Sequence, residues 1–341
     1  MNIPVASKLK GIFQSIDQQL KGQQDRNAEL SEKFNQLQKR EQDIAAQLAN
    51  AKEENLRLLM ELEMRLKENE QKQTAAINDR FYHIALDSVE KEMYLVNRLY
   101  PGNTKRYRAL KNLHKNESCV IVGNGPSLHM EDLNRLQQAG IPTFASNRIY
   151  VAFPKTAWRP TYYMCQDFKM LQEHWQEMSH LEGCTCLFPH SIVYEFEETT
   201  EQKNAIFYPL KYKDPYPIWF SCNLDKIIHE GMTVTFSAMQ IAVMMGFSKI
   251  YLLGVDFNYP FITNGKGEKV LDRSQQTHFV ENYYNKNEVI YQPNLDASLQ
   301  AYQAAKEYAD ANGIEIYNAT RGGNLEVFPR VDFDEIFKSD Q

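Results

Sequence analysis

The first hundred residues carry apolar side chains at a regular spacing. From Val5 to Tyr100 there is no proline, and Gln, Glu, Lys, Leu and Ala dominate, which predicts one uninterrupted helix. Steps of four and three residues alternate along it without a slip, and a repeat of 3.5 residues predicts a left-handed coiled coil that needs a partner helix. Twelve of the sixteen seam positions are apolar. The sixteen positions are Leu9, Phe13, Ile16, Leu20, Gln23, Asn27, Leu30, Phe34, Leu37, Glu41, Ile44, Leu48, Ala51, Asn55, Leu58 and Leu62.

The partner of this helix is expected to be a second copy of the chain. Asn27 and Asn55 fall at a positions of the heptad, where a polar residue costs stability but specifies a parallel dimer and its alignment. Phe13 and Phe34 are large for a dimer seam, so trimers and tetramers stay open. The alternative is a helical stalk that folds back on its own domain.

Beyond Pro101-Gly102-Asn103 the pattern changes to alternating strand and helix signals. Crossover units of this kind predict an α/β fold: a Rossmann-like, mainly parallel sheet with helices on both faces, preceded by the coiled-coil helix. We therefore expect an oligomerisation region at 1–100, a linker at 101–116 and a catalytic domain at 117–341. The expected strands are Ser118–Val122, Thr143–Ser146, Thr161–Gln166, Thr185–Phe188, Ala205–Pro209, Lys249–Phe257 and Ile314–Asn318, and the helices are Met130–Ala139, Phe236–Met245 and Leu295–Asn312.

Charge and composition narrow the class of protein. Lys and Arg number 38 against 44 Asp and Glu, which gives no basic footprint for nucleic acid. No run of eighteen apolar residues and no secretory signal is present, so a cytoplasmic location is expected, and the basic stretch Lys105 to Lys115 leaves contact with the inner face of the membrane open. The five cysteines suit reduced thiols, and Cys184 and Cys186 stand too close together for the usual zinc spacing, so no metal site is predicted.

In a parallel sheet the ligand lies beyond the carboxyl ends of the strands, so the residues after each strand are the first candidates. The loop from Gly123 to Ser127 follows the first strand. Its glycines, Gly123 and Gly125, let the backbone turn sharply toward a phosphate at the start of the next helix, and Asn124 offers an amide to a sugar or base. The alternative is a plain strand-to-helix turn, since the third glycine of the dinucleotide fingerprint is missing.

Other strand ends add polar groups. Asn147 follows the second strand, where it either contacts the nucleotide or caps the next helix. Asp167 closes the third strand and suits a hydroxyl or a metal ion. Thr233 opens an apolar helix, where it binds phosphate, caps the helix or does both. The strand after that helix delivers Asp256 to the same edge.

A long polar and aromatic segment follows Asp256, and segments of this length usually serve as lids or binding loops. It contains His278, which we expect to be an exposed imidazole beside tyrosines and a general base, and Tyr283, expected to bind substrate. A purely structural His is the alternative. Arg321, after the last strand, offers a cation to an anionic substrate. The segment also contains Arg273, Glu281, Asn282 and Tyr284.

The ordered set of motifs resembles a known family. CVIVGNGPSL, FASNRIY, GMTVTFSAMQIAVMMGFSKIYLLGVDFNY, THFVENYY and IYNATRGG, within about residues 117 to 330, resemble the MptE-like family, named after 6-hydroxymethylpterin diphosphokinase. The same motifs resemble the bacterial sialyltransferases that use CMP-sialic acid. The sialyltransferases carry two His three residues apart where this chain has His278 and Glu281, and a basic residue where it has Gly231.

The two resemblances imply different chemistry. If the sialyltransferases are the guide, Asn124, Gly125 and Asn147 hold the CMP part of a nucleotide-sugar donor, Thr233 lies near its phosphate, and His278 belongs to the active-site segment. The implied function is a glycosyltransferase of bacterial surface-glycan or protein glycosylation, acting on a glycan or protein acceptor without an obligatory metal. If the diphosphokinase is the guide, ATP lies over the Gly123 loop and Mg²⁺ is held by Asp167 or Asp256. A third hypothesis makes the coiled coil the functional part and the α/β domain a non-catalytic scaffold.

Overall fold

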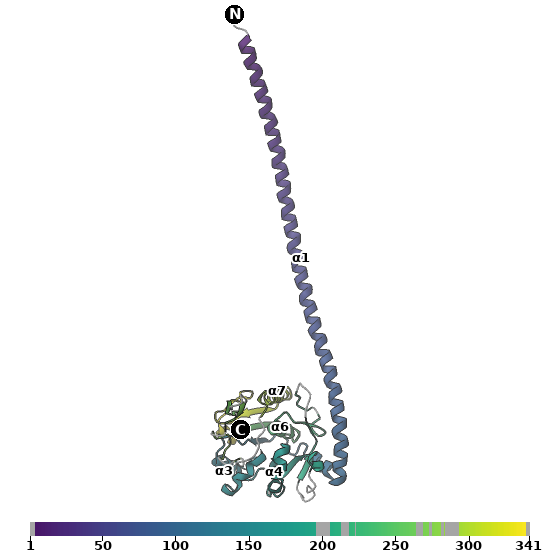
Figure 1. Cartoon of the computed structure of the whole chain (residues 1–341), viewed down its shortest axis with the longest axis vertical. Coiled ribbons are helices and arrows are strands. Elements are labelled where there is room, and N and C mark those ends of the chain that lie inside the picture. Colours follow the sequence, from purple (N-terminus) through teal and green to yellow (C-terminus); the bar gives the residue numbers. More distant parts are fainter. Residues whose placement is uncertain are drawn as a thin grey trace. The chain divides into compact units, whose positions relative to one another are not determined.

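The structure is a computed structural model that describes residues 4–195, 205–212, 218–221, 223–263, 269–272, 275–280, 283 and 293–338. The chain divides into two compact units, Met1–Asp79 and Arg80–Gln341. Helix α1 (Pro4–Leu99) supplies the whole described part of the first unit and the first element of the second (Figure 1). Among the described residues, no helix is long and apolar enough to cross a membrane.

In the first unit the helix predicted from the heptad pattern is confirmed. Ion pairs between side chains four residues apart lie on its surface, such as Lys33 with Glu29 and Arg65 with Glu61, each at 2.7 Å. The large apolar side chains of the seam, by contrast, are exposed along its length.

The second unit contains a sheet of seven parallel strands in the order β11-β8-β1-β2-β3-β4-β5. The predicted α/β fold with a mainly parallel sheet is thereby confirmed. The strands of the sheet are β1 (Ser118–Val122), β2 (Thr143–Ser146), β3 (Tyr162–Met164), β4 (Thr185–Pro189), β5 (Ala205–Tyr208), β8 (Lys249–Leu253) and β11 (Glu315–Asn318). Two short pairs lie outside it: β6 (Leu210–Lys211) with β7 (Ile228–His229), and β9 (Phe261–Thr263) with β10 (Lys269–Leu271).

Helices cover both faces of the sheet, because alternate strand residues point to opposite sides. In β1, Cys119 and Ile121 belong to one buried apolar cluster, and Val120 and Val122 belong to the other. Figure 1 shows α6 and α7 on one side and α3 and α4 on the other. The helices are α2 (Asn103–Ala109), α3 (Met130–Ala139), α4 (Phe168–Ser179), α5 (Ile192–Glu195), α6 (Val234–Met244) and α7 (Leu295–Asn312), with 3-10 helices at Asn147–Lys155 and Phe333–Phe337.

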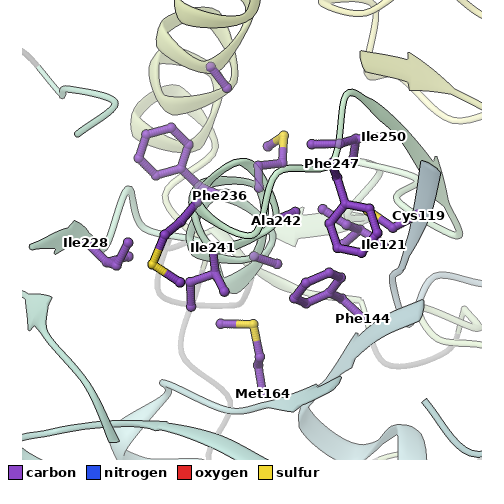
Figure 2. Packing of buried hydrophobic residues seen from close by; sticks show 14 of the residues in the cluster. Cys119, Ile121, Phe144, Met164, Ile228, Phe236, Ile241, Ala242, Phe247 and Ile250 are labelled. Carbon is purple, nitrogen blue, oxygen red and sulfur yellow. The ribbon is translucent and has the colours of Figure 1, made fainter. Parts of the chain in front are cut away.

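Helix α6 is the most apolar element and lies against the centre of the sheet. Figure 2 shows Phe236, Ile241 and Ala242 of α6 packed among side chains of the central strands, including Ile121, Phe144 and Met164. Almost every residue of α6 is buried, which explains why its sequence has no polar face. This packing holds the start of α6 at the same edge as the ends of β1 and β8.

The segment 101–116, predicted as a linker, includes α2, and its Asn103 and Tyr107 are buried. Asn103 exchanges two hydrogen bonds of 2.8 Å with the backbone of Phe207 in β5. The last turns of α1 also pack on this unit, where Ala85, Val89 and Met93 surround Ile227. Four cysteines are described as free thiols, and Cys222 lies outside the described residues.

Candidate functional site

The strand order reverses beside β1. From β1 the chain builds outward to β5, then returns to place β8 and β11 on the other side of β1. In open parallel sheets ligands bind beyond the carboxyl ends of the strands at such a switch point. The loops that follow β1, β2 and β8 meet at this edge, and they carry most of the candidate residues.

The Gly123 loop is built so tightly that two of its positions require glycine. Gly123 N–H donates to the Leu253 carbonyl at 2.7 Å, and Gly125 N–H donates to the Gly254 carbonyl at 2.9 Å. A Cβ at Gly123 would stand 2.9 Å from the carbonyl carbon of Gly254, and a Cβ at Gly125 would stand 2.6 Å from Cγ of Asp256. The glycines therefore let the loops after β1 and β8 close onto each other.

Asp256 lies where these two loops join. Strand β8 ends at Leu253, earlier than the pattern predicts, so Asp256 stands in the following loop rather than at the strand's last position. The Ser127 hydroxyl donates to its carboxylate at 2.8 Å. Burial raises the pKa of Asp256, and the bond from Ser127 opposes that rise. The hydrogen bond between Ser127 and Asp256 therefore ties the loop after β1 to the loop after β8.

Two asparagine side chains follow the adjacent strands β1 and β2. Asn124 Nδ2 donates to the Ser146 carbonyl at 3.0 Å, which places its side chain beside the end of β2. Asn147 has a φ of 56°, a left-handed conformation that Asn tolerates better than most residues, and its carbonyl accepts from the Tyr163 hydroxyl at 2.7 Å. The side-chain oxygen of Asn147 accepts no hydrogen bond from the described residues, so it does not cap the helix that begins there.

The amide oxygens of both asparagines are buried acceptors. Neither Asn124 Oδ1 nor Asn147 Oδ1 has a hydrogen-bond partner among the described residues. A buried amide oxygen without a donor costs about 1 to 3 kcal/mol. An N–H or O–H donor from a ligand would remove that cost at either position.

The segment with His278 covers this edge of the sheet. Phe279 N–H donates to the carbonyl of Asn124 at 3.0 Å. The His278 ring stacks on Tyr283 with 3.8 Å between centroids and 9° between planes. Tyr283 is anchored in turn, because its hydroxyl accepts from Arg148 N–H at 3.1 Å and its carbonyl accepts from the Arg148 guanidinium. Arg148 directly follows Asn147. Arg148 and Tyr283 therefore connect Asn147, predicted to bind the nucleotide, to His278, predicted to be the general base.

The structure corrects one expectation about His278. The imidazole is only partly exposed, not solvated, because Tyr283 covers one face. Burial lowers its pKa to about 4, so the ring is neutral near pH 7. Arg273, Glu281, Asn282 and Tyr284 lie outside the described residues.

Thr233 begins α6 at the same edge of the sheet. Its hydroxyl accepts from Thr235 N–H at 3.4 Å, so it caps the helix. Gly231 and Met232, just before it, both have positive φ and turn the chain sharply into the helix. Tyr302 of α7 hydrogen-bonds to Thr233 and Thr235. The helix N-terminus presents a positive dipole end at this edge, a favourable place for phosphate.

Two predicted substrate residues make contacts of another kind. Asp167 is exposed and caps α4 by accepting from Met170 N–H at 2.9 Å. Arg321 forms a two-pronged ion pair with Asp132 of α3, at 2.6 and 2.8 Å. Arg330 donates to the carbonyls of Thr320, Gly322 and Gly323 and fixes the loop after β11.

The structure therefore brings together Asn124, Asn147, His278 and Tyr283, while Asp167 and Arg321 serve helix ends.

Sequence reasoning missed Tyr163 and Asp132. Tyr163 lies inside a buried strand and Asp132 inside a helix, where no local pattern marks a polar contact. Gly254 was visible in the sequence as the glycine two residues before Asp256, but its contact with Gly123 needed the strand order. Among the described residues no group of three or more His, Cys, Asp or Glu is arranged to hold a metal ion.

Part of the chain is similar to known proteins. No match is found among curated proteins. A solved structure of the MAf glycosyltransferase from Magnetospirillum magneticum AMB-1 is similar over 69% of this chain and 39% of that one, with 14% sequence identity and a TM-score of 0.40. This chain thus spans less than half the length of that protein. Residues 96–261 match the model of the family described as 6-hydroxymethylpterin diphosphokinase MptE-like, which confirms the MptE-like resemblance over that segment.

Proposed function

We propose that the protein is a transferase that moves a sugar from a CMP-linked donor to a hydroxyl group of a glycan or protein acceptor, in bacterial surface-glycan or protein glycosylation. The observation that carries the proposal is the pair of buried amide oxygens on Asn124 and Asn147, at the ends of two adjacent strands, for which the described residues offer no hydrogen-bond donor. Groups at this edge of the sheet suit the base and the phosphate of a CMP-sugar.

The side-chain amides of Asn124 and Asn147 would bind the nucleobase of the donor. Cytosine carries an exocyclic amine that donates hydrogen bonds, whereas uracil presents an oxygen at the same position. A ligand amine placed between Asn124 Oδ1 and Asn147 Oδ1 would satisfy acceptors that are otherwise buried at a cost of about 1 to 3 kcal/mol each. Cytosine therefore suits the two amides better than uracil does.

The phosphate of the donor suits the start of α6. In the Gly123 loop the N–H groups of Gly123 and Gly125 already donate to carbonyls of β8 and the loop after it, and Asp256 fills the space beside Gly125. The N-terminus of α6, capped by Thr233, offers a positive dipole end. That end would stabilise the negative charge that builds on the phosphate as the sugar leaves.

The transfer step needs a general base that takes the proton of the acceptor hydroxyl. In the proposed reaction the acceptor hydroxyl oxygen forms a bond to the anomeric carbon, the bond from that carbon to the phosphate oxygen breaks, and CMP leaves with the electron pair. His278 accepts the hydroxyl proton, and its neutral form at pH 7 follows from its lowered pKa of about 4. Tyr283 positions the ring by stacking, and Asp256 holds the glycine loop through Ser127.

A second candidate is an ATP-dependent diphosphokinase, favoured by the name of the family that matches residues 96–261. Adenine also carries an exocyclic amine, so the two amides suit ATP as well as CMP. In this alternative ATP would lie over the Gly123 loop and Asp256 or Asp167 would hold Mg²⁺. The two candidates differ in their need for the metal and in the number of phosphates bound.

Calorimetric titration of the full chain with CMP, CDP, UDP and ATP, each with and without Mg²⁺, separates them. The proposal expects binding of CMP without metal, weakened at least about tenfold in Asn124→Ala and in Asn147→Gly, since each variant loses one acceptor. Glycine is favoured at the positive φ of residue 147, so Asn147→Gly removes the side chain without straining the backbone. The exposed helix-end variant Asn312→Ala is the matched control and should bind as the wild type does.

The other outcomes each overturn the proposal. Binding of ATP that requires Mg²⁺, with no binding of CMP, would establish the diphosphokinase alternative. Binding of none of the four nucleotides would favour the non-catalytic scaffold. Equal binding in the wild type and both amide variants would place the nucleotide away from the ends of β1 and β2.

A further inference from the structure

The first unit of the chain has an apolar stripe that nothing in that unit covers. Eleven large apolar side chains on the heptad seam of α1, from Leu9 to Leu62, are each between 46% and 65% exposed. The stripe continues over almost eight heptads, more than the three to four that mark a coiled coil in a sequence. A helix with this repeat winds around a partner of the same repeat, because only then does the seam stay buried along its length.

We propose that this seam, residues 9–62, pairs with the same residues of a second copy of the chain, parallel and in register. The inference depends on the helix alone and not on the proposed function. The two asparagines of the seam select this occupant, and the glutamate of the seam agrees with it.

The asparagines select the parallel, aligned pair. Asn27 and Asn55 both occupy a positions, four heptads apart. In a parallel pair in register each a residue faces its own copy, so each asparagine meets an asparagine and the amides hydrogen-bond to each other. In an antiparallel pair a residues face d residues, and on this seam those are mostly Leu and Ile. An asparagine amide buried against them would lose its partner at a cost of about 1 to 3 kcal/mol.

The charges along the seam agree with the same arrangement. Glu41 occupies an a position, and in a parallel pair it lies beside the g position that precedes it on the other helix, which is the partner subunit's Arg40. None of the flanking g and e pairs that would meet across a parallel pair holds two charged residues, so these positions permit the arrangement without selecting it. These pairs are Ile12 with Asp17, Gln19 with Gln24, Arg26 with Ser31, Lys33 with Gln38, Arg40 with Ala45, Gln47 with Lys52 and Glu54 with Leu59.

Single cysteines placed on the helix test the arrangement directly, because no cysteine precedes Cys119 in the chain. Leu30→Cys and Leu58→Cys put a thiol at two d positions, and Glu32→Cys puts one at an f position on the outer face of the same heptad as Leu30. Each full-length variant is oxidised and run without reductant, and the wild type gives the background from the natural cysteines. Light scattering of the reduced proteins gives the number of copies.

The proposal expects two copies in solution and efficient disulfide-linked pairs from both Leu30→Cys and Leu58→Cys, with Glu32→Cys at the wild-type background. An antiparallel pair would be shown by two copies in solution with failure of at least one of the two d variants to form disulfide-linked pairs, because each d residue then faces an a residue. A single copy would show a stalk that buries its seam on its own domain, and three or four copies would show a larger bundle. Each of those three results overturns the proposal.

Discussion

The two units of this chain use apolar side chains in opposite ways. In the second unit the apolar residues of the strands and of α6 are buried inside that unit, with Val120, Phe144 and Phe236 fully covered. In the first unit Leu30 and Phe34 are as regular in spacing but are 64% and 61% exposed. The hydrophobic effect is satisfied by burial inside the second unit, whereas the apolar side chains of the first unit stay exposed.

The difference teaches how glycine and polar residues should be interpreted in each unit. In the second unit, glycines at loop ends are required by close contacts, and buried amides point to a ligand. In the first, a glycine such as Gly22 meets nothing within 4 Å, and the seam asparagines point to another helix. Substitutions should therefore have opposite effects in the two units.

The largest effect is expected on the seam of the helix. The double variant Leu30→Asp with Leu37→Asp places four charges in the seam of a pair, and it should weaken association at least about a thousandfold, or ~4 kcal/mol. Light scattering over a dilution series measures this, and circular dichroism checks that the second unit stays folded. The pair Glu32→Asp with Lys39→Asp, on the outer face of the same heptads, is the matched control. Unchanged association in the seam variant would show that these residues do not face a partner.

The next effect concerns pH in the second unit. The pKa of His278 is lowered to about 4, against 6.5 for an ordinary histidine. The unfolded chain therefore takes up the proton first as pH falls, and up to about 3 kcal/mol of stability is lost between pH 6.5 and 4, while all of it is present above pH 6.5. Histidine NMR of the wild type and His278→Gln identifies the resonance and its midpoint. A midpoint near 6.5 would contradict the stacked, partly buried ring.

Glycine substitutions should differ in sign between the units. Gly123→Ala pushes a Cβ against the backbone of Gly254, which cannot move far within the sheet, and should lower the free energy of unfolding by about 1 to 3 kcal/mol. Gly22→Ala on the open surface of α1 should instead favour the helix by about 0.5 to 1 kcal/mol. Thermal denaturation followed by circular dichroism compares them. A neutral Gly123→Ala would mean that the loops after β1 and β8 do not close as described.

The smallest effect is expected from Tyr283→Phe. This change keeps the ring that stacks on His278 but removes the oxygen that accepts from Arg148 N–H at 3.1 Å. Stability should fall by about 1 kcal/mol, and the pKa of His278 should move back toward 6.5 as the ring loosens. The exposed Tyr94→Phe on α1 is the control and should change neither quantity. An unmoved pKa of His278 would show that the bond from Arg148 N–H to the Tyr283 hydroxyl does not position His278.

The sequence predicted the fold more completely than the site. The helices at Met130–Ala139 and Leu295–Asn312 and the strand at Ser118–Val122 end where their caps and polar neighbours predict. Helix α4 was missed: it has a kink at His174 and mixed apolar spacing, so its pattern is weak. Asn124 and Asn147 could be predicted as neighbours from their strand ends, but the roles of Arg321 and Asp167 could not, because their partners depend on tertiary contacts.

If the amide oxygens of Asn124 and Asn147 accept hydrogen bonds from the base of a nucleotide, the protein must distinguish CMP from UMP, which differ at the exocyclic amine. The ratio of the dissociation constants of UMP and CMP, for the full chain and for Asn147→Gly, measures this. We expect the wild type to bind CMP at least about tenfold more tightly than UMP, and this preference to disappear largely in Asn147→Gly. Equal affinity for the two nucleotides in the wild type, or the same preference in the variant, would contradict it.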